Sequence, residues 1–331
     1  MKLSSDKKIF IAGANGMVGS AVKRLLSKKG FGIKDNKRVI FTPSKSELNL
    51  ANYNEVKDWF ELNKPSIVII AAAKVGGILA NSSNPYEFLL ENMKIQNNII
   101  ESSWKVGVEK LIFLGSSCIY PKFAQQPIKE EYLMSGELEP TNEWYAIAKI
   151  SGIKLCEALN KQYNFDAISL MPSNLYGEGD NYDLFSSHVL PAFINRFHEA
   201  KEKNLKNVTC WGTGKALREF LNVDDLAEAI LFSLENWSLN NKNAPKDPRN
   251  KKLSWLNVGS GEEITIKELA EKIAKIIGYQ GEINWDISKP DGTPRKLMDS
   301  SRIRSLGWKP LISLDEGLKK TIKIYENNQK K

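Results

Sequence analysis

The sequence predicts an α/β protein, with a doubly wound parallel sheet and a smaller C-terminal α/β domain. Throughout the first half, short apolar runs alternate with segments whose apolar residues recur at helical spacing. A glycine-rich turn joins the first apolar run to the first helical segment. The chain has 331 residues, of which 42% are hydrophobic and 26% charged. That composition is typical of globular proteins, and the length is sufficient for two domains.

The elements of the first half follow from these runs. Short, mostly β-branched apolar segments bounded by turns indicate buried strands, and the longer periodic segments indicate helices that cover them. We expect strands at residues 8–12, 38–42, 66–73, 110–115 and 166–171, with helices at residues 17–29, 53–62, 86–106 and 143–163. This alternation is typical of a parallel sheet with helices on both faces.

The second half is less regular. Helical periodicity returns at residues 188–203, 224–236 and 265–278, and a polar stretch rich in Asn, Lys and Pro predicts a loop at residues 238–254. We therefore predict two domains. The first comprises residues 1–173 plus about 222–258, and the second comprises about 174–221 plus 259–331.

Charge and cysteine usage exclude several functions. The net charge of +8 comes from 47 basic and 39 acidic side chains, and the basic ones are scattered among acids, so we expect no nucleic-acid partner. The longest apolar run, residues 67–73, is too short to span a membrane, and the N-terminus lacks the pattern of a secretion signal. Cys118, Cys156 and Cys210 form no C-x-x-C pair. We therefore expect no disulfide framework, no metal site and a cytoplasmic location.

A glycine-rich loop after the first strand predicts a dinucleotide site. Gly13, Gly16 and Gly19 form G-x-x-G-x-x-G between the strand and the helix. In such a loop the first glycine permits a tight turn, the second lets a pyrophosphate approach the backbone, and the third lets helix and strand pack closely. The helix N-terminus supplies N–H donors. Purely structural turns are the alternative, but the strand–loop–helix setting favours a Rossmann-type cofactor domain.

The end of the second strand favours NADP(H) over NAD(H). An NAD site normally has an Asp or Glu there to bind the ribose hydroxyls. Here the strand leads into Pro43, Ser44 and Lys45, and no carboxylate occurs before Glu47, whereas Arg38 and Lys45 flank the position. A cation in place of the acid suits a 2′-phosphate. The alternative is that Lys45 is only a surface residue.

A phenol and an ammonium group are expected on one helix face. Tyr145 and Lys149 are four residues apart, and a nearby positive charge favours phenolate and lowers the pKa of a tyrosine. Such a phenol can exchange a proton with a carbonyl or alcohol. The fourth strand ends at Gly115, Ser116 and Ser117, where open α/β sheets bind ligands. The Ser116 hydroxyl can therefore bind the same carbonyl oxygen as Tyr145.

Together these features resemble the extended short-chain dehydrogenase/reductase family. Within it, the chain is most similar to the branch that epimerises and reduces a GDP-linked 4-keto-6-deoxy sugar. The resemblance extends over nearly the whole chain, and its most specific segments are GSSCIYP at residues 115–121 and KPDGTPRK at residues 289–296. Trp144, beside the tyrosine, and the stretch GEGDNYD at residues 177–183 depart from the branch pattern. Insertions are expected near residues 34–36 and 238–252.

The resemblance implies roles for individual side chains. Ser116, Tyr145 and Lys149 would serve hydride transfer at a C4 ketone, whereas Cys118 and His188 would exchange the protons at C3 and C5. The thiol of Cys118 and the imidazole of His188 have ordinary pKa values close enough to neutrality to exchange these protons. A structural role is the alternative for Cys118 and for His188. The resemblance also implies NADP(H) contacts at Gly13, Ala14, Asn15, Gly16, Met17, Val18, Gly19, Lys45, Leu48, Asn49, Leu50, Leu114, Gly115, Ser116, Ser117, Lys149, Pro172, Ser173, Asn174, Leu175 and His188.

The GDP-sugar side of the site is also implied by the resemblance. Arg196, Trp211, Arg218 and Asp291 match substrate-binding positions: arginines suit a diphosphate, and an indole suits a stacked ring. Core packing of Trp211 and a simple Asp-Gly turn at Asp291 are the alternatives. The resemblance further implies a homodimer, with helices 86–106 and 145–163 at its interface. The rival functions are a nucleotide-sugar 4-epimerase, a 4,6-dehydratase and a cofactor-sensing regulator.

Overall fold

The structure, a computed structural model, describes residues 3–4, 6–32, 38–183, 186–289 and 291–329. Residues 34–36, one of the expected insertions, lie outside the described part. Six strands form the first sheet. Five lie within a few residues of their predicted places: β1 (Lys8–Ala12), β2 (Val39–Phe41), β3 (Ile67–Ile70), β4 (Lys110–Leu114) and β5 (Ala167–Pro172). The sixth, β9 (Trp255–Val258), was not predicted.

The strand order confirms the doubly wound fold. The order in the sheet is β2-β1-β3-β4-β5-β9, and all of the neighbours are parallel. The chain therefore runs from β1 to one side and then crosses to the other side. Open sheets bind ligands at the carboxyl ends of the strands where the winding reverses, here beside β1 and β3. The loops after β1, β3, β4 and β5 are thus the expected site.

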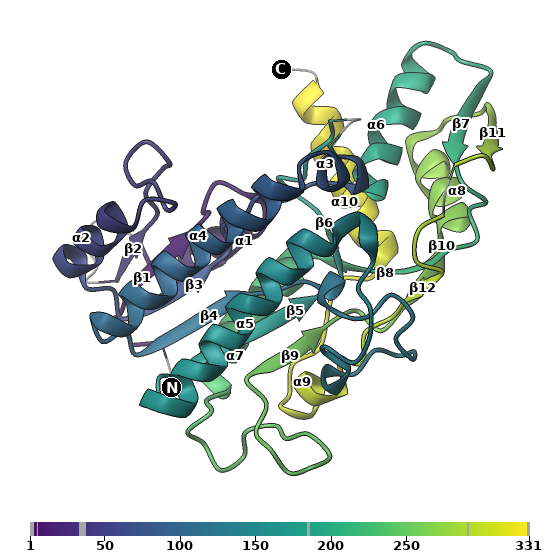
Figure 1. Ribbon diagram of the computed structural model, residues 1–331. Coiled ribbons are helices and arrows are strands. Elements are labelled where there is room, and N and C mark those ends of the chain that lie inside the picture. Colours follow the sequence, from purple (N-terminus) through teal and green to yellow (C-terminus); the bar gives the residue numbers. More distant parts are fainter. Residues whose placement is uncertain (1–2, 5, 33–37, 184–185, 290, 330–331) are drawn as a thin grey trace.

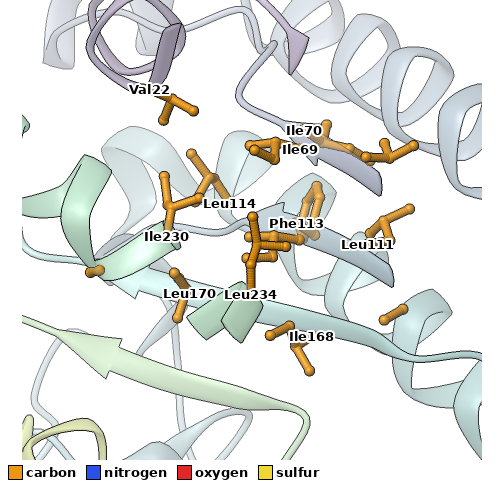
Figure 2. Close-up of a cluster of buried hydrophobic side chains, with 14 of the residues drawn as sticks. Val22, Ile69, Ile70, Leu111, Phe113, Leu114, Ile168, Leu170, Ile230 and Leu234 are labelled. Carbon is orange, nitrogen blue, oxygen red and sulfur yellow. The ribbon is translucent and has the colours of Figure 1, made fainter. Parts of the chain in front are cut away.

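Helices cover both faces of this sheet. On one face α1 (Met17–Lys28) lies against α7 (Val223–Asn236), and on the other α4 (Pro85–Lys105) lies between α2 (Tyr53–Asn63) and α5 (Glu143–Tyr163). Figure 1 shows α4 and α5 running side by side across the sheet. Figure 2 shows side chains of β3, β4 and β5 meeting those of α1 and α7. Because both faces are covered, residues 67–70 and 111–113 are fully buried and apolar.

A second, smaller unit has its own core. Its strands are β6 (Asn174–Tyr176), β7 (Asn207–Trp211), β8 (Leu217–Asn222), β10 (Glu263–Thr265), β11 (Glu282–Asp286) and β12 (Arg295–Lys296). Its helices are α6 (Val189–Glu202), α8 (Ile266–Ile277) and α10 (Leu314–Gln329). Thr265 and Glu268 form a capping box that begins α8. The apolar faces of α6 and α8 pack around Phe197 and Ile273.

The C-terminal third of the chain contributes to both cores. Met298, Ile303 and Trp308 pack in the first core, and α9 (Ser301–Ser305) lies beside β9. The two-domain division therefore stays a prediction, and residues 298–308 belong by packing with the first unit. Among the described residues, none of the helices combines the length and apolar character that crossing a membrane requires.

Candidate active site

The glycine loop after β1 forms an uncapped helix N-terminus. Gly13 has a φ of +79°, and Gly16 N–H donates to its carbonyl over 3.0 Å, which closes the loop. Gly16 is the N-cap of α1 and supplies no side-chain acceptor, so the first N–H groups of α1 are open to a ligand. A Cβ on Gly19 would lie 2.1 Å from the Gly13 oxygen. The loop thus has the shape of an anion cradle. Ala14 is buried inside it and Asn15 is exposed.

The loop after β2 exposes Lys45, the residue predicted to meet a 2′-phosphate. Glu47 accepts from the Ser44 N–H at 2.7 Å and from its hydroxyl at 2.8 Å, and these bonds lower the pKa of the Glu47 carboxyl. Lys45, between them, is exposed. Arg38, by contrast, donates to the Lys29 carbonyl at the opposite end of β2. The phosphate role of Lys45 stays a prediction, and Arg38 already has a backbone partner. Residues 48–50 form the turn that leads to α2.

Tyr145 and Lys149 share a face of α5, as predicted, but the expected effect on the tyrosine pKa is wrong. Loss of water contact raises the pKa of Tyr145 well above its ordinary value, and the nearby Cys118 thiol adds to the rise. The Lys149 Nζ donates to the Leu114 carbonyl at 2.8 Å and lies 5.7 Å from the centre of the Tyr145 ring. Burial lowers the pKa of Lys149 to about 8. The ammonium is thus held at the end of β4.

Ser116 and Cys118 lie directly beyond β4. A short 3₁₀ turn, Ser117–Ile119, begins with the Ser116 Oγ accepting from the Cys118 N–H at 3.4 Å. Gly115 precedes it, packed so closely on Met171 that a Cβ there would lie 2.2 Å from the sulfur. Burial raises the pKa of the Cys118 thiol, and the charge of Lys296, a hydrogen bond from Ser116 and the charge of Lys149 oppose the rise. The turn contacts α5, so the structure brings Ser116, Cys118, Tyr145 and Lys149 together.

His188 begins α6, from the second unit. It is the N-cap residue, and two residues earlier the Ser186 carbonyl accepts from the Gly77 N–H at 2.9 Å. That bond ties the segment after β3 to the segment carrying the imidazole. Part of His188 is exposed. Partial loss of water contact lowers the pKa of its imidazole, and the positive charge of Lys296 lowers it further.

The segment predicted to hold the nicotinamide follows β5. Asn174 Nδ2 donates to the Glu219 carbonyl at 2.9 Å, and Ser173 N–H donates to the Val258 carbonyl at 3.0 Å. The Ser173 Oγ is buried without a partner among the described residues. An unsatisfied buried hydroxyl next to a strand end is consistent with a ligand group at this position.

The four residues predicted to bind the substrate differ in exposure and in the hydrogen bonds that they already make. Trp211 is 60% exposed and Lys289 lies 5.5 Å from its ring centre, so its indole is not a core residue. Arg196 donates to the Thr209 carbonyl and Arg218 to the Leu217 carbonyl, each at 2.8 Å. Both Asp291 oxygens accept from Thr213, the N–H at 2.6 Å and the hydroxyl at 2.8 Å. Asp291 thus fixes the turn after β7.

One side chain at this site was missed by the sequence analysis. Lys296, on β12, lines the same small pocket as Ser117 and Cys118, and it acts electrostatically on both Cys118 and His188. Glu139 and Thr293 line that pocket as well. Lys296 lies in the segment KPDGTPRK that carried the resemblance, and its position there was the available signal.

Comparison with known proteins agrees with this arrangement. Residues 9–244 match the model of the NAD dependent epimerase/dehydratase family. The chain belongs to this family. Among the family's curated members, a probable GDP-L-fucose synthase from Oryza sativa is 53% identical over 97% of this chain and 92% of its own length. The GDP-L-fucose synthase of Escherichia coli is 49% identical over 98% of each chain.

Solved structures show the same architecture. A GDP-mannoheptose C4 reductase from Campylobacter jejuni, solved with NADP bound, superposes with a TM-score of 0.87 and is 36% identical, covering 98% of this chain and 99% of its own. The GDP-mannoheptose C4 reductase thus shares the architecture of this chain, and open α/β sheets of this kind bind ligands at the strand ends where the predicted site residues lie.

Proposed function

We propose that this protein converts GDP-4-keto-6-deoxy-D-mannose to GDP-L-fucose with NADP(H), by 3,5-epimerisation and then reduction of the C4 ketone. The observation that carries the proposal is the thiol of Cys118, two residues beyond Ser116 and beside Tyr145 and Lys149. Reduction of a ketone needs no thiol, whereas moving protons at the neighbouring carbons needs one more acid–base group on the opposite face. The names of the relatives from Oryza sativa and Escherichia coli support the same activity.

The residues present fit NADP(H). The open N–H groups of α1 and the Gly13–Gly19 loop suit a pyrophosphate, because Gly16 at the N-cap has no side chain to block its approach and Gly19 lets the loop pack closely on the helix. Exposed Lys45 suits a 2′-phosphate, since Glu47 is turned toward Ser44. The segment at Ser173 and Asn174 would hold the nicotinamide. When bound, the reduced cofactor supplies a hydride for C4.

The chain's own residues carry the protons. Hydrogens at C3 and C5 are acidic because both carbons flank the ketone. Cys118 as thiolate takes a proton from one face, and the electron pair moves to the C4 oxygen. Ser116 and Tyr145 donate hydrogen bonds to that oxygen and so stabilise the enolate. His188, on α6, returns a proton from the other face. After hydride arrives at C4, Tyr145 protonates the alkoxide, and Lys149 holds positive charge next to the phenol.

The test is turnover of a defined substrate. Purified protein with GDP-4-keto-6-deoxy-mannose and NADPH should lose the NADPH absorbance band and yield an L-fuco product carrying solvent deuterium at C3 and C5 in D₂O. Cys118→Ser should bind NADPH normally and lose the deuterium exchange. Absence of NADPH consumption by the wild type would refute the proposal.

A second candidate is C4 reduction without epimerisation. The structural relative from Campylobacter jejuni, a GDP-mannoheptose C4 reductase, favours it. A reduced product that keeps the configuration at C3 and C5, with no deuterium there, would identify this activity. The same assay therefore separates the two candidates.

We further propose a cytoplasmic homodimer. The three cysteines are free and buried, which suits a reducing compartment. Tyr86 on α4 and Trp144 and Ile147 on α5 are large apolar side chains exposed at 69%, 42% and 36%, which suits a partner surface on these helices. Light scattering should give twice the chain mass, and Trp144→Glu should shift it toward the monomer.

A further inference from the structure

Lys296 and Cys118 line the same small pocket. Cys118 comes from the turn beyond β4, and Lys296 comes from β12 near the C-terminal end of the chain. The pocket joins the first unit, which carries the thiol, to the second, which carries His188 on α6. A cation at this junction reaches both groups that the proposed epimerisation requires.

The backbone around Lys296 is held firmly in place. β12 pairs in parallel with β8, with Lys296 opposite Arg218. Leu297 N–H donates to the Gln126 Oε1 at 2.8 Å, and the Leu297 carbonyl accepts from the Ile128 N–H at 2.7 Å. Met298 N–H donates to the buried Glu219 carboxyl at 3.0 Å. These bonds to two separate segments, β8 and residues 126–128, fix the position from which the lysine side chain extends.

The ammonium group of Lys296 is not neutralised by an acid. Within the described part of the chain, its side chain makes no hydrogen bond and has no carboxylate within 4.0 Å. Glu139, the acid facing it in the pocket, pairs with Lys122 at 3.1 Å. Its neighbour Arg295 is paired with Glu263 at 2.8 Å, and Arg218 adds further positive charge. Burial lowers the pKa of Lys296, and the negative charges of Cys118 and Glu139 oppose that fall. Leaving a partly enclosed cation unpaired is costly, which points to a use for its charge.

The charges around the two proton carriers come from two elements, β12 and α5. Cys118 faces Lys296 on β12 and Lys149 on α5, with the Tyr145 phenol also on α5. His188 faces Lys296. A positive charge stabilises a thiolate and disfavours an imidazolium, so it acts on the two groups in the same direction, toward loss of a proton.

We propose that Lys296 is a positioning residue for epimerisation, whose ammonium keeps Cys118 as the thiolate acceptor and makes protonated His188 a readier donor. In the step it assists, the C–H bond breaks, the S–H bond forms, and the electron pair moves to the ketone oxygen. On the opposite face the imidazolium N–H breaks and a C–H bond forms with the enolate pair. The catalytic part of this inference rests on the proposed function, but the effect on the thiol does not.

The first experiment needs no substrate. The ultraviolet absorbance of the Cys118 thiolate is titrated with pH, as the difference between each protein and the same protein carrying Cys118→Ser. Lys296→Met should raise the midpoint by about 1–3 pH units, as expected for loss of a close opposite charge. Lys296→Arg should keep the wild-type midpoint, and so should Arg295→Met, which removes the paired neighbouring cation. An unchanged midpoint in Lys296→Met would overturn the proposal.

A second measurement separates this role from simple substrate binding. The pH profile of deuterium incorporation at C3 and C5 should shift to higher pH in Lys296→Met and return in Lys296→Arg. A higher KM for the GDP-sugar with an unshifted profile would mean that Lys296 only binds the substrate, which also overturns the proposal. Should Lys296→Met fail to fold, Lys296→Gln replaces it. If the wild type turns over no GDP-4-keto sugar, the proposed function fails while the thiolate titration still decides the role of Lys296.

Discussion

Substituting two glycines of the phosphate loop should separate folding from cofactor binding. At Gly19 a new Cβ would lie 2.1 Å from the Gly13 oxygen, 2.6 Å from the Gly13 carbonyl carbon and 2.7 Å from the Ala14 Cα. All three are backbone atoms, so no side-chain rotation can relieve the overlap. At Gly16 the nearest atom, the Gly13 oxygen, would be 3.4 Å away, which is ordinary contact.

The loss in free energy of unfolding follows from these distances. Overpacking of this kind costs about 1–3 kcal/mol or more, while Ala is better than Gly inside a helix by about 1 kcal/mol. Because the whole loop must move, we expect Gly19→Ala to lower the free energy of unfolding by about 2 kcal/mol. Gly16→Ala replaces a tolerated N-cap residue with a poor one, at a cost of less than about 1 kcal/mol.

The assay combines unfolding with binding. The unfolding midpoint in urea is measured without cofactor, and NADPH affinity is measured by calorimetry. Gly19→Ala should lose stability and affinity together. Gly16→Ala should keep near-wild-type stability and lose affinity, because its methyl group stands where the pyrophosphate approaches the N-terminus of α1. Equal destabilisation by the two substitutions, or a wild-type midpoint for Gly19→Ala, would refute the reasoning.

Three further predictions concern single charges. Reductase activity, measured by NADPH oxidation, should fall as the pH rises through about 8, because the Lys149 ammonium loses its proton there. In the same assay Lys149→Met should lower kcat by at least about 10²-fold. Lys45→Glu should lower the preference for NADPH over NADH by roughly tenfold or more, measured as the ratio of kcat/KM values. Burial raises the pKa of Glu219 to about 7 from 4.5. The stability that its protonated form contributes should therefore be present below pH 4.5 and be lost as the pH rises to 7. Glu219→Gln should remove this pH dependence from the unfolding midpoint.

Each of these has an outcome that contradicts it. Reductase activity that stays constant above pH 8, or a near-normal kcat in Lys149→Met, would exclude the Lys149 ammonium from the reaction. An unchanged cofactor ratio in Lys45→Glu would leave Lys45 as a surface residue. The same loss of stability between pH 4.5 and 7 in the wild type and in Glu219→Gln would assign that loss to another carboxyl group.

Local pattern predicted most of the fold. The strand at β3 is a continuous run of Ile and Val, and the loop with Gly13 and Gly19 is specified by contacts between residues a few positions apart. The spacing of Tyr145 and Lys149 likewise placed both on one face of α5. Such features depend on helix and strand periodicity, which the order of residues contains directly.

One prediction failed, and other features were not predicted, because they depend on distant contacts. The pKa of Tyr145 is raised, since enclosure by the folded chain outweighs a lysine that is bound to the Leu114 carbonyl. Arg38 donates a hydrogen bond to the Lys29 carbonyl, a contact that local pattern does not reveal. Residues 298–308 pack on the first core although the chain has by then passed through the second unit.

The sequence by itself determined the doubly wound sheet, the phosphate loop and the Tyr145/Lys149 pair, because each arises from short-range spacing and from the burial of apolar faces. Only the tertiary structure decided which charges meet at the site. β12 is two residues long and has no periodicity of its own, yet its pairing with β8 places Lys296 against Cys118. Electrostatic effects act through space, so the pairing of strands far apart in the chain, rather than local pattern, determines them.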